Sequence, residues 1–170
     1  QAASIYVGYA SGSSGTYTHS GGTTRITSQL RVGDASGAIG SYALSSTGVL
    51  DATGITEYIG YSGKGTLTQT GGANQAANIP VGYASGSSGT YTQSGGTTTI
   101  GSNLYVGNDA YSVGSYSLSL AGNLTAAGEY IGNSGTGTFT QSGGTNQAAN
   151  ISIGYNSGSS GTYTQSGGIA

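Results

Sequence analysis

The chain has almost no chemically reactive side chains. Its 170 residues include no Cys, Met or Trp, one His and one Pro. Without Cys, disulfides cannot stabilise the fold, although their absence does not assign the protein to a cellular compartment. Lys and Arg together number three, and they do not cluster in the sequence. Because counterion release from nucleic acid requires a basic cluster, we expect no nucleic-acid partner.

Long apolar runs and helical patterns are also lacking. No segment approaches the roughly 18 consecutive apolar residues that suggest a membrane-spanning helix, so we expect no membrane span. The chain contains 35 Gly and many β-branched residues, both of which are poor helix formers. No stretch has an apolar stripe at the helical period. The composition therefore predicts an all-β protein.

A repeat organises what is present. The motif Gly-Thr-Tyr-Thr-Gln-Ser-Gly-Gly at residues 89–96 recurs with variation in seven copies, whose central residues lie 23 to 25 positions apart. A fixed period in this range indicates a solenoid, a propeller or an array. A propeller blade needs four strands and usually about 40 residues. We therefore predict a β-solenoid with one coil per copy.

The copies are of three types, in the order A-B-C-A-B-C-A. Type B has one glycine where type A has two, and type C has a shorter first turn and ends in Asn-Gln-Ala-Ala-Asn. The equivalent glycines of the three type A copies are Gly8, Gly82 and Gly154. The predicted fold is thus an all-β β-solenoid (β-helix) of seven coils of about 24 residues, with three short strands per coil, in an A-B-C super-repeat of roughly 72–74 residues.

Two rows of apolar residues recur at fixed places and predict the core. The residue before the glycine that ends the first strand is Val or Ile in every copy. This core ladder consists of Val7, Val32, Ile59, Val81, Val106, Ile131 and Ile153. The central residue of the motif is aromatic or Leu. This aromatic ladder consists of Tyr17, Tyr42, Leu67, Tyr91, Tyr116, Phe139 and Tyr163.

The direction of the aromatic ladder depends on the residue two positions later. In type B this residue is Leu44 or Leu118, which favours inward aromatics because residues i and i+2 share a face. Gln stands there in four other copies and argues against it, unless its amide bonds to backbone groups at a corner. We expect inward aromatics, which leave candidate Thr rows on the surface. These are Thr16, Thr18, Thr66, Thr68, Thr90, Thr92, Thr138, Thr140, Thr162 and Thr164.

Few residues qualify as candidates for catalysis or metal binding. Glu57 and Glu129 lie two residues before a core-ladder residue, on inward parity. We interpret each as a corner carboxylate that caps backbone N–H groups. They are three coils apart, roughly 14 Å, too far for the paired carboxylates of a glycosidase. His19 takes the Gln or Leu slot, and we expect a surface substitution. We predict a non-enzyme with no catalytic residues, no cofactor and no metal.

Two of the repeat units resemble repeats of large secreted surface proteins of bacteria. The units are residues 89–96 and the stretch Tyr-Ile-Gly-Asn-Ser-Gly-Thr-Gly-Thr-Phe-Thr-Gln-Ser-Gly-Gly at residues 130–144. They are similar to β-solenoid regions of autotransporter passengers and of proteins that carry a sorting tail. The resemblance covers essentially the whole chain. It implies an extracellular or cell-surface location and an adhesin, matrix or filament role.

Neither end of the chain resembles the atypical polar repeats that cap natural solenoids. Residues 1–3 match the tail of a type C copy, and residues 169–170 lie inside a type A copy. We expect residues 1–170 to form one β-solenoid domain that is a segment of a longer array. Its main partner would be itself, by covalent continuation, which the A-B-C order favours, or by head-to-tail stacking.

The main functional hypothesis is a structural protein that builds an extracellular filament or surface matrix from stacked β-coils. One alternative is an ice-binding solenoid that uses the outward Thr rows. The other is an adhesin that binds a glycan or surface, with carbohydrate as the candidate partner, through the outward Tyr6, Tyr58, Tyr105 and Tyr130.

Overall fold

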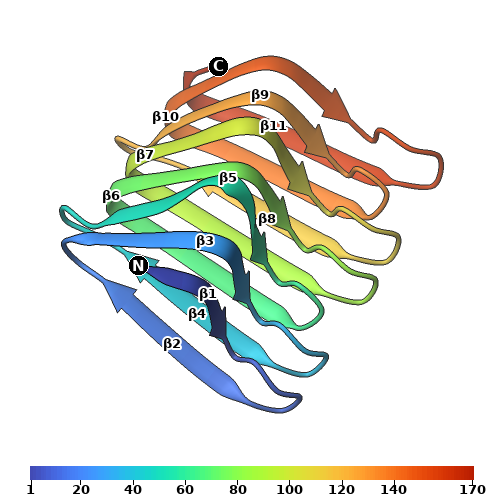
Figure 1. Cartoon of the computed structure of the whole chain (residues 1–170). Coiled ribbons are helices and arrows are strands. Elements are labelled where there is room, and N and C mark those ends of the chain that lie inside the picture. The colour runs from blue at the N-terminus through green and yellow to red at the C-terminus, as the bar shows by residue number, and fades with distance from the viewer.

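The protein is a stack of β-coils without a helix. The computed structural model describes residues 1–170, and its strands pair in parallel from coil to coil (Figure 1). The strands are β1 (Ala2–Val7), β2 (Ser14–His19), β3 (Thr23–Val32), β4 (Ile39–Leu44), β5 (Val49–Ile59), β6 (Lys64–Val81), β7 (Ser88–Val106), β8 (Val113–Leu118), β9 (Asn123–Ile131), β10 (Thr136–Ile153) and β11 (Ser160–Ile169). This architecture confirms the predicted all-β β-solenoid.

Each coil contains three straight runs. Between β6 and β7, residues 64–69 pair with 88–93, residues 73–76 with 97–100, and residues 79–81 with 104–106. The turn after each core-ladder residue is the first corner of a coil. The register shifts between these runs mark the second corner, at the glycines of the motif, and the third corner. Strands of three to six residues joined by tight corners suit a chain of short β-patterns separated by glycine.

The three coil types differ at the second corner. In types A and C this corner has two glycines; β6, β7, β10 and β11 run through it as single strands, whereas the first type A copy breaks there into β2 and β3. In type B one glycine remains, and the chain breaks into β4 and β5 or β8 and β9. Ser46 and Leu120 there adopt φ values of 52° and 51°, a region that costs non-glycine residues energy.

The core consists of ladders of equivalent residues. Each core-ladder residue pairs with the next along the stack, from Val7 with Val32 to Ile131 with Ile153. Aromatic-ladder residues pair in the same way and point inward, with Tyr42, Tyr91 and Tyr116 fully buried. Stacked ring centroids lie 4.7–5.0 Å apart, which contributes about 0.5–1.5 kcal/mol per pair beyond area burial.

The glycine of the first corner is required by its surroundings. Gly60 adopts φ +77°, and Gly65 across the turn lies so close that a Cβ on it would stand 2.1 Å from the Gly60 nitrogen. No side chain fits between the two backbones. The glycine after each Val or Ile therefore marks the turn where two backbone segments approach closely and the coil closes.

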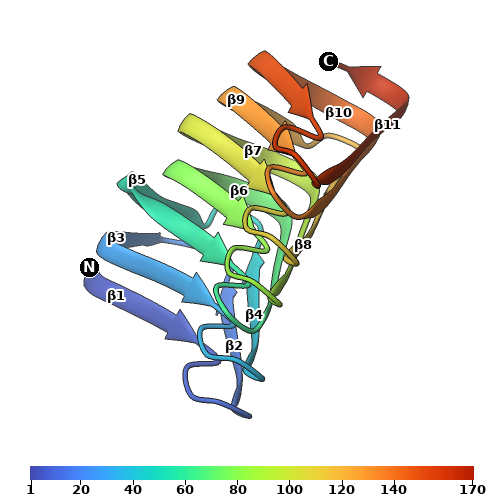
Figure 2. The ribbon, with the colours of Figure 1, turned by 90° about the vertical axis from the view of Figure 1, so that its right-hand side faces the viewer.

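The two end coils pair on one side only. β1 and β2 pair only with strands of the second coil, and β11 pairs only with β10 (Figure 2). Their outer backbone groups and inward-facing side chains are therefore more exposed than those of the middle coils. Since the chain forms no helix, none has the length and apolar character needed to cross a membrane.

Candidate functional site

Three polar side chains lie in the interior of the first type C coil, beside its apolar core residues. Glu57, Gln69 and Asn74 point into it and are fully buried. Asn74 Nδ2 donates hydrogen bonds to Glu57 Oε2 at 2.9 Å and to the hydroxyl oxygen of Tyr91, in the next coil, at 3.1 Å. The Tyr91 hydroxyl donates to Gln69 Oε1 at 2.7 Å, and Thr98 Oγ1 donates to the same oxygen at 2.6 Å. A connected polar layer thus crosses the core.

The same layer recurs in the second type C coil. Asn146 Nδ2 donates to Glu129 Oε2 at 3.0 Å and to the Tyr163 hydroxyl at 3.3 Å. The Tyr163 hydroxyl donates to Gln141 Oε1 at 2.7 Å. The super-repeat therefore repeats a buried hydrogen-bonding pattern as well as a backbone shape.

The two buried carboxyl groups titrate far from their ordinary range. Burial raises the pKa of Glu57 to about 8, against the opposing effect of the hydrogen bond from Asn74. Burial likewise raises the pKa of Glu129 to about 7, opposed by the bond from Asn146. In an apolar surrounding the neutral acid is favoured because a buried charge is costly.

Unpartnered oxygens indicate the same protonation state. Glu57 Oε1 and Asn74 Oδ1 are buried and have no hydrogen-bond partner, and the second Glu–Asn pair repeats this. A protonated carboxyl group has a donor of its own, whereas a carboxylate has none. The expectation that Glu57 caps backbone N–H groups is wrong, because its hydrogen-bond partner is the Asn74 side chain. Because both carboxyl groups are buried inside the coil, their protonation affects the stability of the fold, and they have almost no contact with solvent.

The Gln slot also faces inward, and its amides bond to the corners. Gln93 Nε2 donates to the carbonyl oxygens of Gly96 at 3.2 Å and Asn123 at 3.0 Å. The Tyr116 hydroxyl donates to Gln93 Oε1 at 2.6 Å. These bonds explain how an amide shares a face with the aromatic ladder: it satisfies carbonyl groups that the corner frees.

The expectation that His19 is a surface substitution is wrong. Its side chain is only 5% exposed, because its slot points into the coil as the Gln slot does. His19 Nε2 lies 3.1 Å from the carbonyl oxygen of Gly22, and Nδ1 lies 3.0 Å from the Tyr42 hydroxyl oxygen. Nε2 therefore carries the donated proton, since a carbonyl only accepts.

The candidate Thr rows lie on the outer face of the wall that carries the aromatic ladder. Thr90 and Thr92 pair with Thr66 and Thr68 on one side and with serines on the other. All ten threonines are half-buried or exposed. The rows are interrupted in the type B coils, where Ser41, Ala43, Ser115 and Ser117 replace threonine.

Tyrosine side chains form a second outer surface, on the wall that carries the core ladder. Tyr58 and Tyr61 pack edge to face at 5.0 Å, and Tyr105 stacks on Tyr130 at 5.2 Å. The Arg31 guanidinium carbon lies 3.8 Å from the centre of the Tyr61 ring. Arg31 also bonds to Asp34 at 3.0 Å. Aromatic rings, amides and hydroxyls that face solvent can bind a partner through stacking and hydrogen bonds.

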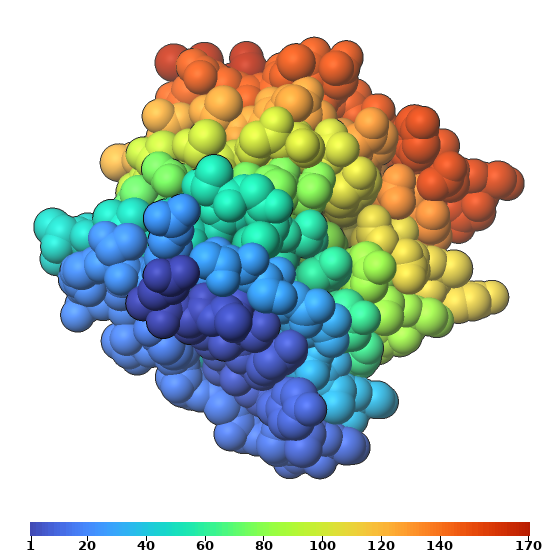
Figure 3. Space-filling view, viewed as in Figure 1, coloured from blue at the N-terminus to red at the C-terminus, as the bar shows by residue number.

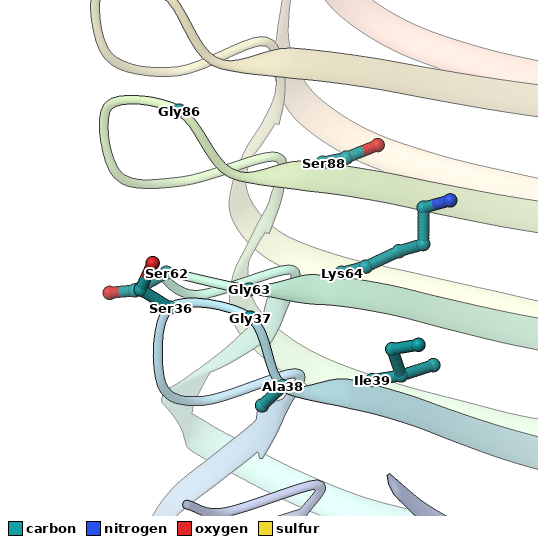
Figure 4. A pocket seen from close by; sticks show the side chains of 9 residues that line it. All are labelled: Ser36, Gly37, Ala38, Ile39, Ser62, Gly63, Lys64, Gly86 and Ser88. Atoms are coloured by element: carbon teal, nitrogen blue, oxygen red, sulfur yellow. The ribbon is translucent and has the colours of Figure 1, made fainter. Parts of the chain in front are cut away.

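The turns after the core ladder project along one edge of the stack (Figure 3). The type C turn is shorter, and a notch of about 350 Å³ opens above it between the neighbouring turns. Ser36 and Ser62 lie together on the turn side of this notch, while Ile39, Lys64 and Ser88 project from the strands (Figure 4). A notch of about 300 Å³ repeats at the second type C turn. Its lining offers hydroxyls and no converging charged groups.

Sequence reasoning missed the two asparagines of the polar layers. Asn74 pairs with Leu50 below and Thr98 above, so alignment of the copies would have placed it on the inner face. What alignment cannot give is that its amide meets a carboxyl group 17 residues earlier, across the coil.

No group of three or more His, Asp or Glu side chains gathers in the structure. No protein-family model matches the chain, and neither a curated protein nor a solved structure matches it.

Proposed function

We propose that the chain is a non-enzymatic structural protein, a building block of an extracellular filament or surface matrix formed by continuous stacking of β-coils. The observation that carries this proposal is that neighbouring coils pair through the same inner ladders at every boundary. Each boundary is a parallel ladder in which Val/Ile meets Val/Ile and the aromatic slot meets its equivalent. A further coil, from the same chain or another molecule, fits an open coil face by the same hydrogen bonds.

The energetics of an open coil face support stacking. An unpaired strand edge offers N–H and C=O groups that pair readily with a similar edge. In the last coil, apolar groups that are buried elsewhere lie open: Ile153 is 52% exposed, whereas the equivalent Ile131 is fully buried. Covering such a face removes apolar area from water, worth about 25 cal/mol per Å². A heterologous contact that does not close upon itself produces an open filament.

The surroundings of the polar layers bear on how the array continues. Gln69 and Asn74 of a type C coil receive or give hydrogen bonds to Tyr91 and Thr98 of the type A coil that follows. A type A coil therefore fits on a type C coil better than on another type A coil. This preference supports continuation in the A-B-C order within one long chain, of which residues 1–170 are a segment.

Electron microscopy of the purified chain at increasing concentration tests this proposal. We expect rods that lengthen with concentration. Gln165→Lys should shorten them, because it puts a charge on the inward-facing slot of the last coil. Thr164→Lys is the matched control, because Thr164 points outward on the same strand. Monodisperse particles of one coil stack at every concentration, for the parent chain and both variants, would contradict self-stacking.

The resemblance of the repeats to those of bacterial surface proteins supports an extracellular or cell-surface location and a place in that class. An antibody against the chain, applied to intact producing cells, tests the location. Labelling before permeabilisation is expected, and labelling only afterwards would contradict it.

An ice-binding role is the second candidate. Two Thr rows lie side by side on one outward face, with neighbouring coils spaced at about 4.8 Å, which presents hydroxyls and methyl groups at regular intervals. Thermal hysteresis at micromolar protein, lost in Thr90→Leu/Thr92→Leu, would support it. No hysteresis in the parent chain would exclude it.

A further inference from the structure

The residues that directly precede the core-ladder residues form an outward row, which is aromatic at four of its seven positions. Pro80 stands in this row between Tyr58 of the coil below and Tyr105 of the coil above. The small ring of Pro80 leaves an open slot of about 260 Å³. Its other lining residues are Thr56, Asn78, Tyr83 and Asn108. We call this space the Pro80 slot.

The chain itself shows what such a gap accepts. Two coils lower, Arg31 lies between Tyr6 and Tyr58 in the same row. Its guanidinium carbon is 5.9 Å and 5.8 Å from the centres of these two rings. The guanidinium packs on the Tyr61 ring, 3.8 Å from its centre, and a flat group thus fits beside two tyrosines of this row that are two coils apart. At Pro80 the two flanking tyrosines are present, the Tyr83 ring packs against Tyr58 at 4.8 Å, and the small Pro80 ring leaves the rest of the space open.

Charge distinguishes the two positions. The Arg31 group has Asp34 as an ion-pair partner at 3.0 Å. The residue of the Pro80 coil that follows the corner glycine, as Asp34 does, is Tyr83, and the coil above supplies Asn108. Asp109 is held by a hydrogen bond from Asn108 Nδ2 at 2.7 Å. None of the residues that line the Pro80 slot carries a charge, which suits an uncharged occupant.

Several polar groups of the slot have no partner within the chain. The hydroxyls of Thr56, Tyr58 and Tyr83 make no intramolecular hydrogen bond, and Asn78 uses only its carbonyl oxygen, which accepts from the Asn103 backbone N–H at 3.2 Å. The Tyr105 hydroxyl oxygen accepts from Asn103 Nδ2 at 3.0 Å, so its own proton remains available. Donors and acceptors thus surround a flat space between aromatic rings.

We propose that the Pro80 slot binds one pyranose ring of a neutral glycan. A pyranose has apolar C–H faces, whose slight positive charge is attracted to the negative face of an aromatic ring. Its edge carries hydroxyls that give and accept hydrogen bonds, as the neutral groups of the slot require. A concave site with apolar walls and a few convergent polar groups is the usual form of a small-molecule site.

The super-repeat contains part of a second slot. Tyr130, Ser152 and Tyr155 occupy the places in the second super-repeat that Tyr58, Pro80 and Tyr83 occupy in the first. Tyr130 and Tyr155 pack edge to face at 5.0 Å, as Tyr58 and Tyr83 do at 4.8 Å. Two of the three type A copies therefore lack the row's aromatic side chain and keep the pair of tyrosines beside it. This inference rests on the adhesive alternative and is independent of filament formation.

The position of Pro80 allows a matched pair of variants. Pro80→Tyr fills the gap with the residue that the first copy has at Tyr6, and Pro80→Ser keeps it open with the residue that the third copy has at Ser152. Both substitutions restore the backbone N–H that proline lacks. Neither should therefore impair folding, which circular dichroism and thermal unfolding check.

The test is titration with cellopentaose, a neutral β-linked glycan, followed by two-dimensional NMR of selectively labelled tyrosine. We expect saturable shifts with a dissociation constant on the order of 1 mM, typical for a small, open site. Pro80→Ser should bind similarly, and Pro80→Tyr should bind at least about tenfold more weakly, a difference of about 1.4 kcal/mol. Tetramethylammonium chloride serves as the cationic probe.

Three results would overturn the proposal: no binding of cellopentaose by the parent chain, equal binding by Pro80→Tyr, or binding of tetramethylammonium without cellopentaose. Electron microscopy of the same samples reports assembly separately, so failure of sugar binding is distinguishable from failure of filament formation.

Discussion

Type B and type C coils have equivalent strands and share the core and aromatic ladders, but they differ at three inner positions. At three equivalent inner positions the first type B coil has leucine and the type C coil stacked on it has a polar residue. The pairs are Leu30 with Glu57, Leu44 with Gln69, and Leu50 with Asn74. A coil with these strand positions therefore accepts either an apolar layer or a polar layer in which most groups are hydrogen-bonded.

The hydrogen bonds of a polar layer depend on which type of coil lies above it. The polar groups of the type C coil bond to one another and to the Tyr91 and Thr98 hydroxyls of the type A coil above, and the leucines of the type B coil below offer them nothing. Buried polar groups can fix register at some cost in stability. The A-B-C order is therefore encoded by hydrogen bonds as well as by turn length.

The largest expected effect of a single substitution comes from moving the carboxyl group into a leucine layer. In Leu104→Glu the new side chain lies directly below Glu129 and shares its own layer with Leu124 in place of an asparagine, so no hydrogen-bond donor is provided for it. An unpaired buried ionisable group should destabilise the fold by about 3–5 kcal/mol, measured by urea unfolding at pH 7. Leu104→Met is the control, since a volume-conserving exchange costs under about 1.5 kcal/mol. Equal losses in both variants would show that the layers are not distinct.

The pH dependence of stability distinguishes the type C layers, which contain Glu57 and Glu129, from the leucine layers of the type B coils, and it needs no substitution. The folded-state pKa of Glu57 is raised from 4.5 to about 8 and that of Glu129 to about 7. Between these values and 4.5 the folded state holds protons that the unfolded state has released. The free energy of unfolding should therefore be highest below about pH 4.5, fall as pH rises and level off above about pH 8, by up to about 1.4 kcal/mol per pH unit and group.

Glu57→Gln/Glu129→Gln should flatten this profile, because the amide has no proton to lose and still offers a donor to asparagine. Denaturant unfolding at several pH values measures both profiles. A parent profile that rises between pH 5 and pH 8, or a double variant with the parent's slope, would contradict neutral buried carboxyl groups.

A smaller loss is expected when the type C coil receives one residue of type B. Asn74→Leu leaves Glu57 Oε2 and the Tyr91 hydroxyl without their shared donor, at a cost of about 1–3 kcal/mol. The double variant Asn74→Leu/Glu57→Leu should recover part of this loss, since removing both partners leaves fewer unsatisfied groups. Additive losses in chemical denaturation would argue against a coupled pair.

The smallest effect is expected outside the coil. Thr92 points outward and is half-buried, so Thr92→Val should change the free energy of unfolding by about 0.5 kcal/mol or less. A loss comparable to that of Asn74→Leu would mean that the outer rows stabilise the stack as much as the inner layers do.

Much of the backbone could be predicted from the sequence, because period-two alternation and repeated glycines state directly which residues share a face and where the chain turns. The seven coils and the inward direction of Tyr91 follow from that parity. The polar layers did not follow. Alternation places Glu57 inside but says nothing of what it meets across the coil, so its bond to Asn74 was missed and a backbone cap was expected.

The candidate surface was only partly predictable for the same reason. Parity places Tyr58 and Tyr105 outside, whereas nothing in the sequence singles out Pro80 as a site residue. Its meaning depends on which rings of the neighbouring coils flank it, although they are distant in the sequence, and on how far their side chains reach. The sequence also does not show that the Arg31 guanidinium lies near two tyrosine rings of the same row.

The central claim is that the coils stack continuously in A-B-C order. X-ray diffraction tests it most directly, on aligned filaments of residues 8–153, which contain two complete A-B-C super-repeats, so that a type A coil meets a type C coil at every junction between molecules. We expect a meridional reflection at about 4.8 Å from the coil spacing and another at roughly 14 Å, three times that spacing, from the alternation of coil types. Filaments that give the coil-spacing reflection without the three-coil reflection would contradict the fixed order, and filaments that give neither would contradict stacking of coils altogether.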